Sequence, residues 1–314
     1  MKTLLRSVVL PLFAFCFVVT PAFAVTIYGT AYNGSGDRLA TLYTVDPNTG
    51  AAIPIGPTGF TRVSAIDFNP LTGVLYGVGV DAQDNATLIS INTTTGMGTA
   101  IGLLGNGLGS SGNSVTISDM SFRSDGVLYA VSSNITSPTV YTIDLMSGAA
   151  TPLGSNTTGR LYQGNALAFD TANSLFFLST DQNNPGAGGE VDLVNQTNGM
   201  FTPTGTTVNY PVDLLDPRTN AMDYDVTTGI LYASVVHGTA TGGVTNFIAQ
   251  IDLATGVVSN PQATIRGLDG LAVLPMQNGT AVPDTGSTLL LALPLLLGLV
   301  LLKRPHCSTA SLQA

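Results

Sequence analysis

The chain repeats a pattern about every 50 residues, and this repeat limits the folds open to it more than any other feature. One short segment, apolar with an aromatic last residue in most copies, ends at positions 68, 122, 169, 224 and 273. A second segment, rich in leucine and aromatic residues, recurs at 27–29, 75–77, 128–130, 175–177 and 231–233. Both segments have the β-branched and aromatic composition that is typical of strands.

A turn signal closes a third strand in each repeat. Asp or Asn stands four residues before Gly in all five copies, at Asp46 and Gly50, Asn92 and Gly96, Asp144 and Gly148, Asn195 and Gly199, and Asp252 and Gly256. A short polar side chain can accept a backbone N–H of its own turn, while Gly supplies a positive φ. A fourth strand follows each turn. Four antiparallel strands per repeat predict an all-β fold, a β-propeller with five four-stranded blades.

The two ends of the repeat region differ in a way that favours a closed ring. The region opens with a strand of the second type at 26–30 and finishes with a strand of the first type at 268–274. We expect these two strands to pair, which completes one blade and leaves no free edge. The predicted propeller spans residues 25–276. The segment Leu42–Gly50 resembles repeats of uncharacterised bacterial extracellular propellers, a resemblance that implies no ligand.

The first 24 residues have the features of a secretory signal peptide. Lys2 and Arg6 precede an apolar stretch over 8–20, and Ala22 and Ala24 form the small-x-small pattern that signal peptidase reads. We expect cleavage after Ala24 and export of the rest of the chain.

The last 38 or so residues contain three parts in a fixed order. A linker over 277–286 ends in a short motif, an apolar run over 287–302 follows, and 303–314 begins with two basic residues. The motif is Val282, Pro283, Asp284, Thr285 and Gly286, and the basic pair is Lys303 and Arg304. The run is slightly short for a transmembrane helix, but we expect it to span the membrane with the basic tail in the cytoplasm.

These three parts resemble a VPDSG-CTERM sorting tail, a relative of the PEP-CTERM signals of Gram-negative bacteria. The resemblance implies an inner-membrane-anchored precursor that an exosortase-type transpeptidase cuts near the motif, which releases it to the cell surface or extracellular matrix. An ordinary C-terminal anchor is the alternative.

The charge of the exported body narrows its partners. Between residues 25 and 281, six arginines and no lysine stand against eighteen acidic residues. Such a surface repels nucleic acid, and we expect no nucleic-acid partner. An extracellular polysaccharide or a surface protein is the expected partner, and calcium is the one cofactor whose binding the acidic residues would allow.

The inventory of reactive side chains argues against most enzyme classes. The body has no cysteine, His237 is its only histidine, and Glu190 is its only glutamate. Multi-histidine metal sites are therefore impossible, and a Ser-His-Asp arrangement would have to use His237. We expect no catalytic, cofactor-binding or metal-binding residues, and a non-catalytic binding or structural protein of the cell surface.

Aspartates supply the alternative, a propeller enzyme of the lyase, glycosidase or lactonase class, with or without calcium. Asp67 and Asp223 occupy equivalent positions of the first strand and are expected to face the central channel, although other copies hold Ser121, Ala168 and Ala272 there. Three closely spaced pairs are interpreted as turn caps or polar strand ends: Asp81 and Asp84, Asp213 and Asp216, and Asp223 and Asp225.

Aromatic residues recur at one position of the second strand, at Tyr28, Tyr76, Tyr129, Phe176 and Tyr232. Such rings could stack on sugars, but their regular spacing favours packing between blades.

Overall fold

The computed structural model describes residues 25–32, 39–109, 116–156, 161–181, 188–210, 215–238 and 244–275. The chain divides into two compact units, Met1–Pro275 and Met276–Ala314, and all described residues belong to the first. The predicted signal segment with Ala22 and Ala24, and the predicted sorting tail from Val282 to Arg304, lie outside the described residues. Within the described ranges, no helix is long and apolar enough to cross a membrane.

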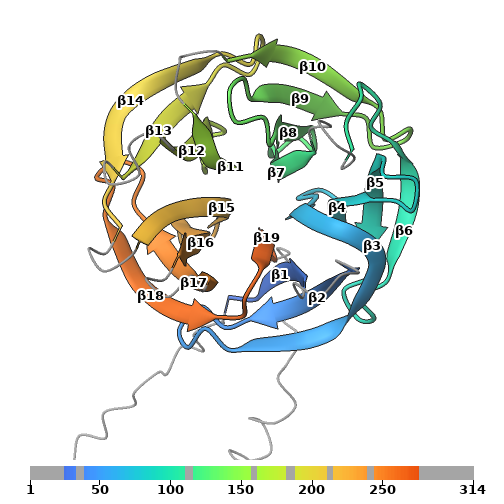
Figure 1. Ribbon diagram of the computed structural model, residues 1–314, viewed down its shortest axis with the longest axis horizontal. Coiled ribbons are helices and arrows are strands. Elements are labelled where there is room, and N and C mark those ends of the chain that lie inside the picture. The colour runs from blue at the N-terminus through green and yellow to red at the C-terminus, as the bar shows by residue number, and fades with distance from the viewer. Residues whose placement is uncertain are drawn as a thin grey trace, which may run out of the picture. The chain divides into compact units, whose positions relative to one another are not determined.

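The described residues form strands in four sheets (Figure 1). The seven-stranded sheet has the order β19-β1-β2-β3-β4-β5-β6, with bounds Leu268–Val273, Ile27–Tyr32, Leu39–Val45, Ala52–Phe68, Leu75–Val80, Ala86–Ile91 and Gly98–Leu103. The next sheet has the order β10-β9-β8-β7, with bounds Ala150–Ser155, Thr139–Ile143, Leu128–Ser132 and Ile117–Phe122. The third is β11-β12-β13-β14, over Tyr162–Phe169, Leu175–Asp181, Gly189–Val194 and Phe201–Val208. The fourth is β15-β16-β17-β18, over Leu215–Asp225, Ile230–Gly238, Val244–Ile251 and Val258–Thr264.

These sheets surround a central axis, with β3, β7, β11, β15 and β19 innermost (Figure 1). The prediction of an all-β propeller is confirmed. The long strand β3 pairs with β2 through its first part and with β4 through its second, so two groups of four strands share it. Counting β3 once in each group gives the predicted five blades, a number that stays a prediction.

The first and last strands of the propeller pair with each other, as the ends of the repeat region predict. β1 and β19 are antiparallel, and the register runs from Ile27 opposite Val273 to Ala31 opposite Leu268. The N–H of Leu274 continues the pairing by donating to the carbonyl of Thr26 at 2.9 Å. The strand that ends the described chain therefore completes the sheet that begins it.

The Asx–Gly turns form as the sequence predicts. Asp46 Oδ1 accepts the N–H of Asn48 at 2.8 Å, and the N–H of Gly50 donates to the Asp46 carbonyl at 2.8 Å. Gly50 has a φ of +72°, a conformation that a residue with a side chain rarely adopts. The other four copies, at 92–96, 144–148, 195–199 and 252–256, make the same two hydrogen bonds.

Each turn glycine also contacts the outer strand of a neighbouring blade. A Cβ atom on Gly148 would lie 2.9 Å from the Cα of Gly102 in β6, closer than such atoms approach. Gly96 meets Gly56 of β3 in the same way. The turn position therefore requires Gly for two independent reasons, its φ and the adjacent backbone.

Aromatic pairs connect neighbouring blades. The rings of Tyr28 and Phe68 lie 5.4 Å apart, as do Tyr76 and Phe122 at 5.6 Å and Tyr129 and Phe169 at 5.3 Å. The predicted packing role is confirmed for these three second-strand tyrosines. Large apolar clusters also cross between sheets, such as one that joins Leu88 of β5 with Met120 of β7.

Candidate functional site

Three aspartates on inner strands bring their carboxyl groups together near the axis. Asp67 lies on β3, Asp119 on β7 and Asp223 on β15, with exposed fractions of 5%, 0% and 8%. Asp67 and Asp223 line one pocket of about 260 Å³ together with Ser121. The prediction that these two residues face the channel is therefore confirmed.

Asp67 and Asp223 each receive two backbone N–H groups, one from their own strand and one from the next sheet. Asp67 accepts from Phe68 and from Phe122 of β7, both at 2.6 Å. Asp223 accepts from Tyr224 at 2.8 Å and from Val273 of β19 at 2.6 Å. The two carboxyl groups thus connect inner strands, and their positions are fixed by the backbone.

Asp119 extends the same arrangement across the channel. Its carboxyl group accepts the N–H of Met120 at 2.9 Å, of Leu167 in β11 at 2.8 Å, and of Met222 in β15 at 3.1 Å. Sequence reasoning missed this residue. The sequence feature that could have identified Asp119 is an acidic residue at a strand position where the other four repeats hold Ala65, Ala166, Ala221 and Gly270.

Burial raises the pKa of all three carboxyl groups well above the ordinary range of aspartate. The charge of Asp223 further raises the pKa of Asp67, while the N–H groups of Phe122 and Phe68 lower it. A hydrogen bond with Asp67 lowers the pKa of Asp223 in turn. Because of this interaction, ionisation of one of the two carboxyl groups makes ionisation of the other less favourable.

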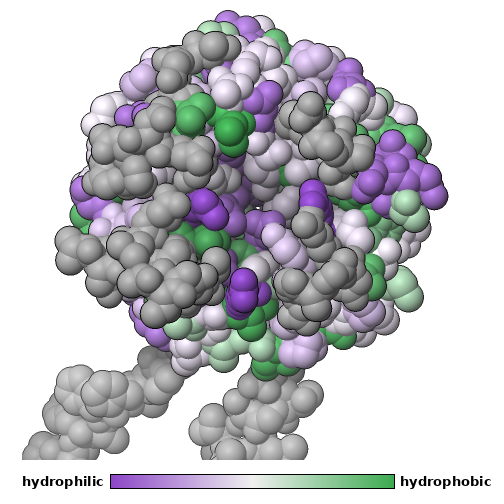
Figure 2. Space-filling view, viewed as in Figure 1, coloured by the Kyte–Doolittle hydropathy of each residue, from purple (hydrophilic) through white to green (hydrophobic). Residues whose placement is uncertain are grey.

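The pocket above this pair has walls from the ends of the inner strands and the turns that follow them. Phe68, Phe122, Phe169 and Tyr224 supply aromatic surface, and Ser124, Asp170, Thr171 and Asn173 supply polar groups. Figure 2 shows one face of the molecule, on which hydrophilic residues gather around the centre. The volume suits a ligand of about one sugar ring.

Two other aspartates from the sequence analysis are turn caps, as interpreted. Asp81 accepts the N–H groups of Gln83 and Asn85, both at 2.9 Å. Asp225 accepts from the N–H of Thr227 and the hydroxyl of Thr228. Asp213, and the side chains of Asp216 and His237, lie outside what the structure describes.

A further carboxyl group lies on β19. Asp269 Oδ1 accepts the side-chain amide of Asn220 at 2.9 Å. Burial raises the pKa of Asp269 to about 6, against the opposing effects of Asn220 and the charge of Arg218. Among the described residues, no group of three or more His, Cys, Asp and Glu side chains is arranged to hold a metal ion.

Comparison with known proteins gives the fold and no closer relationship. No protein-family model matches the chain, and no curated protein matches its sequence. An engineered GH43 glycoside hydrolase with endo-xylanase and exo-arabinofuranosidase activity is similar in structure with a TM-score of 0.54 and 10% identity, over 83% of this chain and 54% of that one. A GH43 β-1,3-galactosidase gives 0.52 and 13%, over 77% and 56%. The periplasmic gluconolactonase of Pseudomonas aeruginosa gives 0.43 and 14%, over 81% and 86%.

The prediction of a non-catalytic binding or structural protein is wrong. The solved structures similar to this chain include two GH43 propeller enzymes, so its fold is one that enzymes also use. At these identities the likeness shows the fold alone. The convergence of Asp67, Asp119 and Asp223 favours the alternative of an enzyme that uses channel aspartates, because two or more carboxyl groups in the channel are what that alternative requires.

Proposed function

We propose that this chain is a hydrolase whose Asp67 and Asp223 perform acid–base catalysis on a small carbohydrate-derived substrate. The observation that supports this most directly is the pair of interacting carboxyl groups, both of raised pKa, that line a pocket of about 260 Å³. Backbone N–H groups on both carboxyls fix their positions, so catalysis would require no rearrangement of the pair.

One proton on the pair would give the two residues different roles. The ionised carboxylate takes a proton from a water molecule as that water attacks the substrate. The protonated partner gives its proton to the leaving oxygen as the bond to that oxygen breaks. Asp119, which lies deeper and is fully buried, holds three N–H groups of three strands and so positions the channel wall.

The closeness of the pair favours a lactone over a glycoside as the substrate. In glycosidases the two carboxyl groups stand about 5 to 9.5 Å apart, with the sugar between them. Asp67 and Asp223 interact closely enough that each changes the pKa of the other, which favours a separation too short for a sugar ring between them. A pair on one side of the substrate suits attack on an ester carbonyl, and opening of a lactone yields one hydroxy acid.

We propose in addition that this activity takes place outside the cell. The segment with Ala22 and Ala24, and the tail with Val282, Pro283, Asp284, Thr285, Gly286, Lys303 and Arg304, support export, membrane anchoring and sorting by an exosortase-type transpeptidase. An extracellular polysaccharide at the surface would be a nearby source of sugar-derived substrates.

Hydrolysis assays test the proposal. The protein is incubated with glucono-δ-lactone, and acid release is followed above the spontaneous rate, beside nitrophenyl xyloside and galactoside. We expect lactone opening that falls at least about 100-fold in Asp223→Asn and in Asp67→Asn. Asp46→Asn is the matched control, since Asn92 and Asn195 occupy the same turn position in other copies.

Three other results of these assays would change or overturn the proposal. Cleavage of the nitrophenyl glycosides alone would replace the lactone with a glycoside. Full activity in either channel variant, with folding verified by circular dichroism, would overturn the assignment of the pair. No hydrolysis of any of the three probes by the folded wild-type protein would count against a hydrolase of this class.

A further inference from the structure

One boundary between blades is built differently from three others. Where β12 faces the end of β15, Phe176 and Tyr224 hold the positions that Tyr28 and Phe68, Tyr76 and Phe122, and Tyr129 and Phe169 hold elsewhere. In those three places the two rings pack together. Phe176 and Tyr224 instead line a cavity of about 580 Å³.

We propose that this cavity is a second ligand site, which adjoins the channel pocket at Asp170 and Tyr224 but does not include the Asp67–Asp223 pair, and that it binds a neutral saccharide. The inference does not depend on the proposed hydrolase activity. The cavity is called here the interblade pocket, lined by Asp170, Phe176, Thr204, Thr206, Tyr224, Gly229, Ile230, Leu231, Gln250, Ile251, Asp252, Leu253, Ala254 and Ser259.

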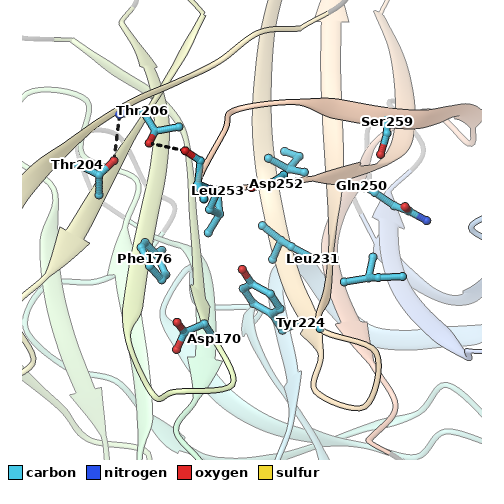
Figure 3. A pocket seen from close by; sticks show the side chains of 14 residues that line it. Asp170, Phe176, Thr204, Thr206, Tyr224, Leu231, Gln250, Asp252, Leu253 and Ser259 are labelled. Carbon is cyan, nitrogen blue, oxygen red and sulfur yellow. Dashed lines mark hydrogen bonds between the residues drawn. The ribbon is translucent and has the colours of Figure 1, made fainter.

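The apolar part of the interblade pocket consists of the two rings and Leu231. Phe176 and Tyr224 are half-buried, so each ring keeps part of its surface accessible while the rest packs in the core. In Figure 3, Tyr224 and Leu231 lie between Asp170 and Phe176 on one side and Gln250 and Ser259 on the other. Aromatic surface of this kind packs against the C–H faces of a sugar ring.

The polar part offers both donors and acceptors. Within the described part of the chain, the Gln250 side-chain amide and the Ser259 hydroxyl form no hydrogen bond with another group, so both can bind a ligand hydroxyl. Burial, and then the charges of Asp170 and Asp252, raise the pKa of the Tyr224 phenol, which keeps it protonated as a donor. Such convergent groups around an apolar floor are typical of ligand pockets.

Two carboxylates hold fixed positions at the edge of the pocket. Asp252 accepts the N–H groups of Ala254 at 2.8 Å and Thr255 at 3.1 Å, and these bonds lower its pKa. Asp170 accepts those of Ala172 and Ser174. Their charges disfavour an anionic ligand, and no lysine or arginine is among the lining residues to offset them. A neutral polyol can donate its hydroxyls to these oxygens.

Saturation-transfer NMR on the full chain tests this site, with xylose and galactose as neutral probes, glucosamine as a cationic probe and glucuronate as an anionic one. We expect contact with the neutral sugars, weakened about tenfold in Gln250→Ala through the loss of ligand hydrogen bonds. Phe176→Leu, which removes ring surface, should weaken binding similarly. Thr142→Ala is the matched control, because Thr142 lies opposite Tyr129 as Gln250 lies opposite Tyr232.

Hydrolysis and sugar binding, measured on the same variants, distinguish the interblade pocket from the channel pocket. Hydrolysis should be unchanged in Gln250→Ala and Ser259→Ala, neither of which lines the channel pocket. Binding of neutral sugars that Gln250→Ala and Phe176→Leu leave intact would overturn the proposal, as would no contact with either sugar. Binding of glucosamine alone would replace the neutral saccharide with an amine and equally overturn it.

Discussion

Asp67 accepts the backbone N–H of Phe122 at 2.6 Å, and this bond joins the inner strands of two neighbouring sheets. The same carboxyl group interacts with Asp223 in the channel. One side chain therefore contributes to holding the ring together and to the chemistry proposed at its centre. Substitutions in this cluster will change both properties, so measurements of stability and of activity have to be made on the same variants.

Loss of the Asp119 carboxyl group should destabilise the protein strongly. Asp119→Ala leaves the N–H groups of Met120, Leu167 and Met222 buried without this acceptor. We expect the free energy of unfolding to fall by about 3 kcal/mol or more, since each unsatisfied buried donor costs roughly 1–3 kcal/mol. Urea denaturation measures this change, and a loss below about 1 kcal/mol would show that the three bonds contribute little.

The stability of the protein should decrease as pH rises through the weakly acidic range. The pKa of Asp269 in the folded protein is about 6, above the roughly 3.9 of an exposed aspartate. Between these values the folded state binds more protons than the unfolded state, so its stability is greatest at the acidic end and is lost as pH rises. Burial of Asp67, Asp119 and Asp223 acts in the same direction.

Thermal unfolding between about pH 3.5 and 6.5, which brackets these two pKa values, measures this effect. Asp269→Asn keeps an acceptor for Asn220 but cannot titrate, and it should reduce the slope of the melting temperature against pH. A variant with the same slope as the wild-type protein would mean that other groups control this range.

Two glycines of similar φ should respond differently to alanine. Gly148 has a φ of +78° and lies against Gly102, whereas Gly229 has a φ of +72° and no atom within 4 Å of the position a Cβ would take. Gly229→Ala bears only the conformational cost of about 1 kcal/mol. Gly148→Ala should cost at least about 1 kcal/mol more, because it also separates two blades. Equal losses in denaturant titrations would show that the neighbouring backbone yields easily.

Much of the fold could be predicted because the repeat carries local chemistry. The Asx–Gly turns, such as Asp46 with Gly50, are formed by residues four apart, so the sequence pattern alone predicts them. The pairing of β1 with β19 followed from the strand types at the two ends. Asp67 and Asp223 were found by alignment of the repeats, since equivalent residues of inner strands face the same axis.

The rest of the site depends on distances between sheets. Asp119 sits two residues before the position that the alignment of channel residues pointed to, and it reaches β11 and β15 only because these strands converge on the axis. The interblade pocket could not be predicted from the sequence either. Phe176 and Tyr224 continue the aromatic pattern in sequence, so the pattern alone gives no sign that these two rings line a cavity.

Because β1 and β19 are neighbours in one sheet, the closed ring does not depend on which repeat comes first in the sequence. A short peptide between Pro275 and Val25 would make the backbone of the propeller continuous, and an exposed Asx turn such as the one at Asp144 would then serve equally well as a beginning and an end. The propeller is therefore suited to circular permutation. Its first residue lies where β1 and β19 pair inside one blade, and not at a boundary between blades.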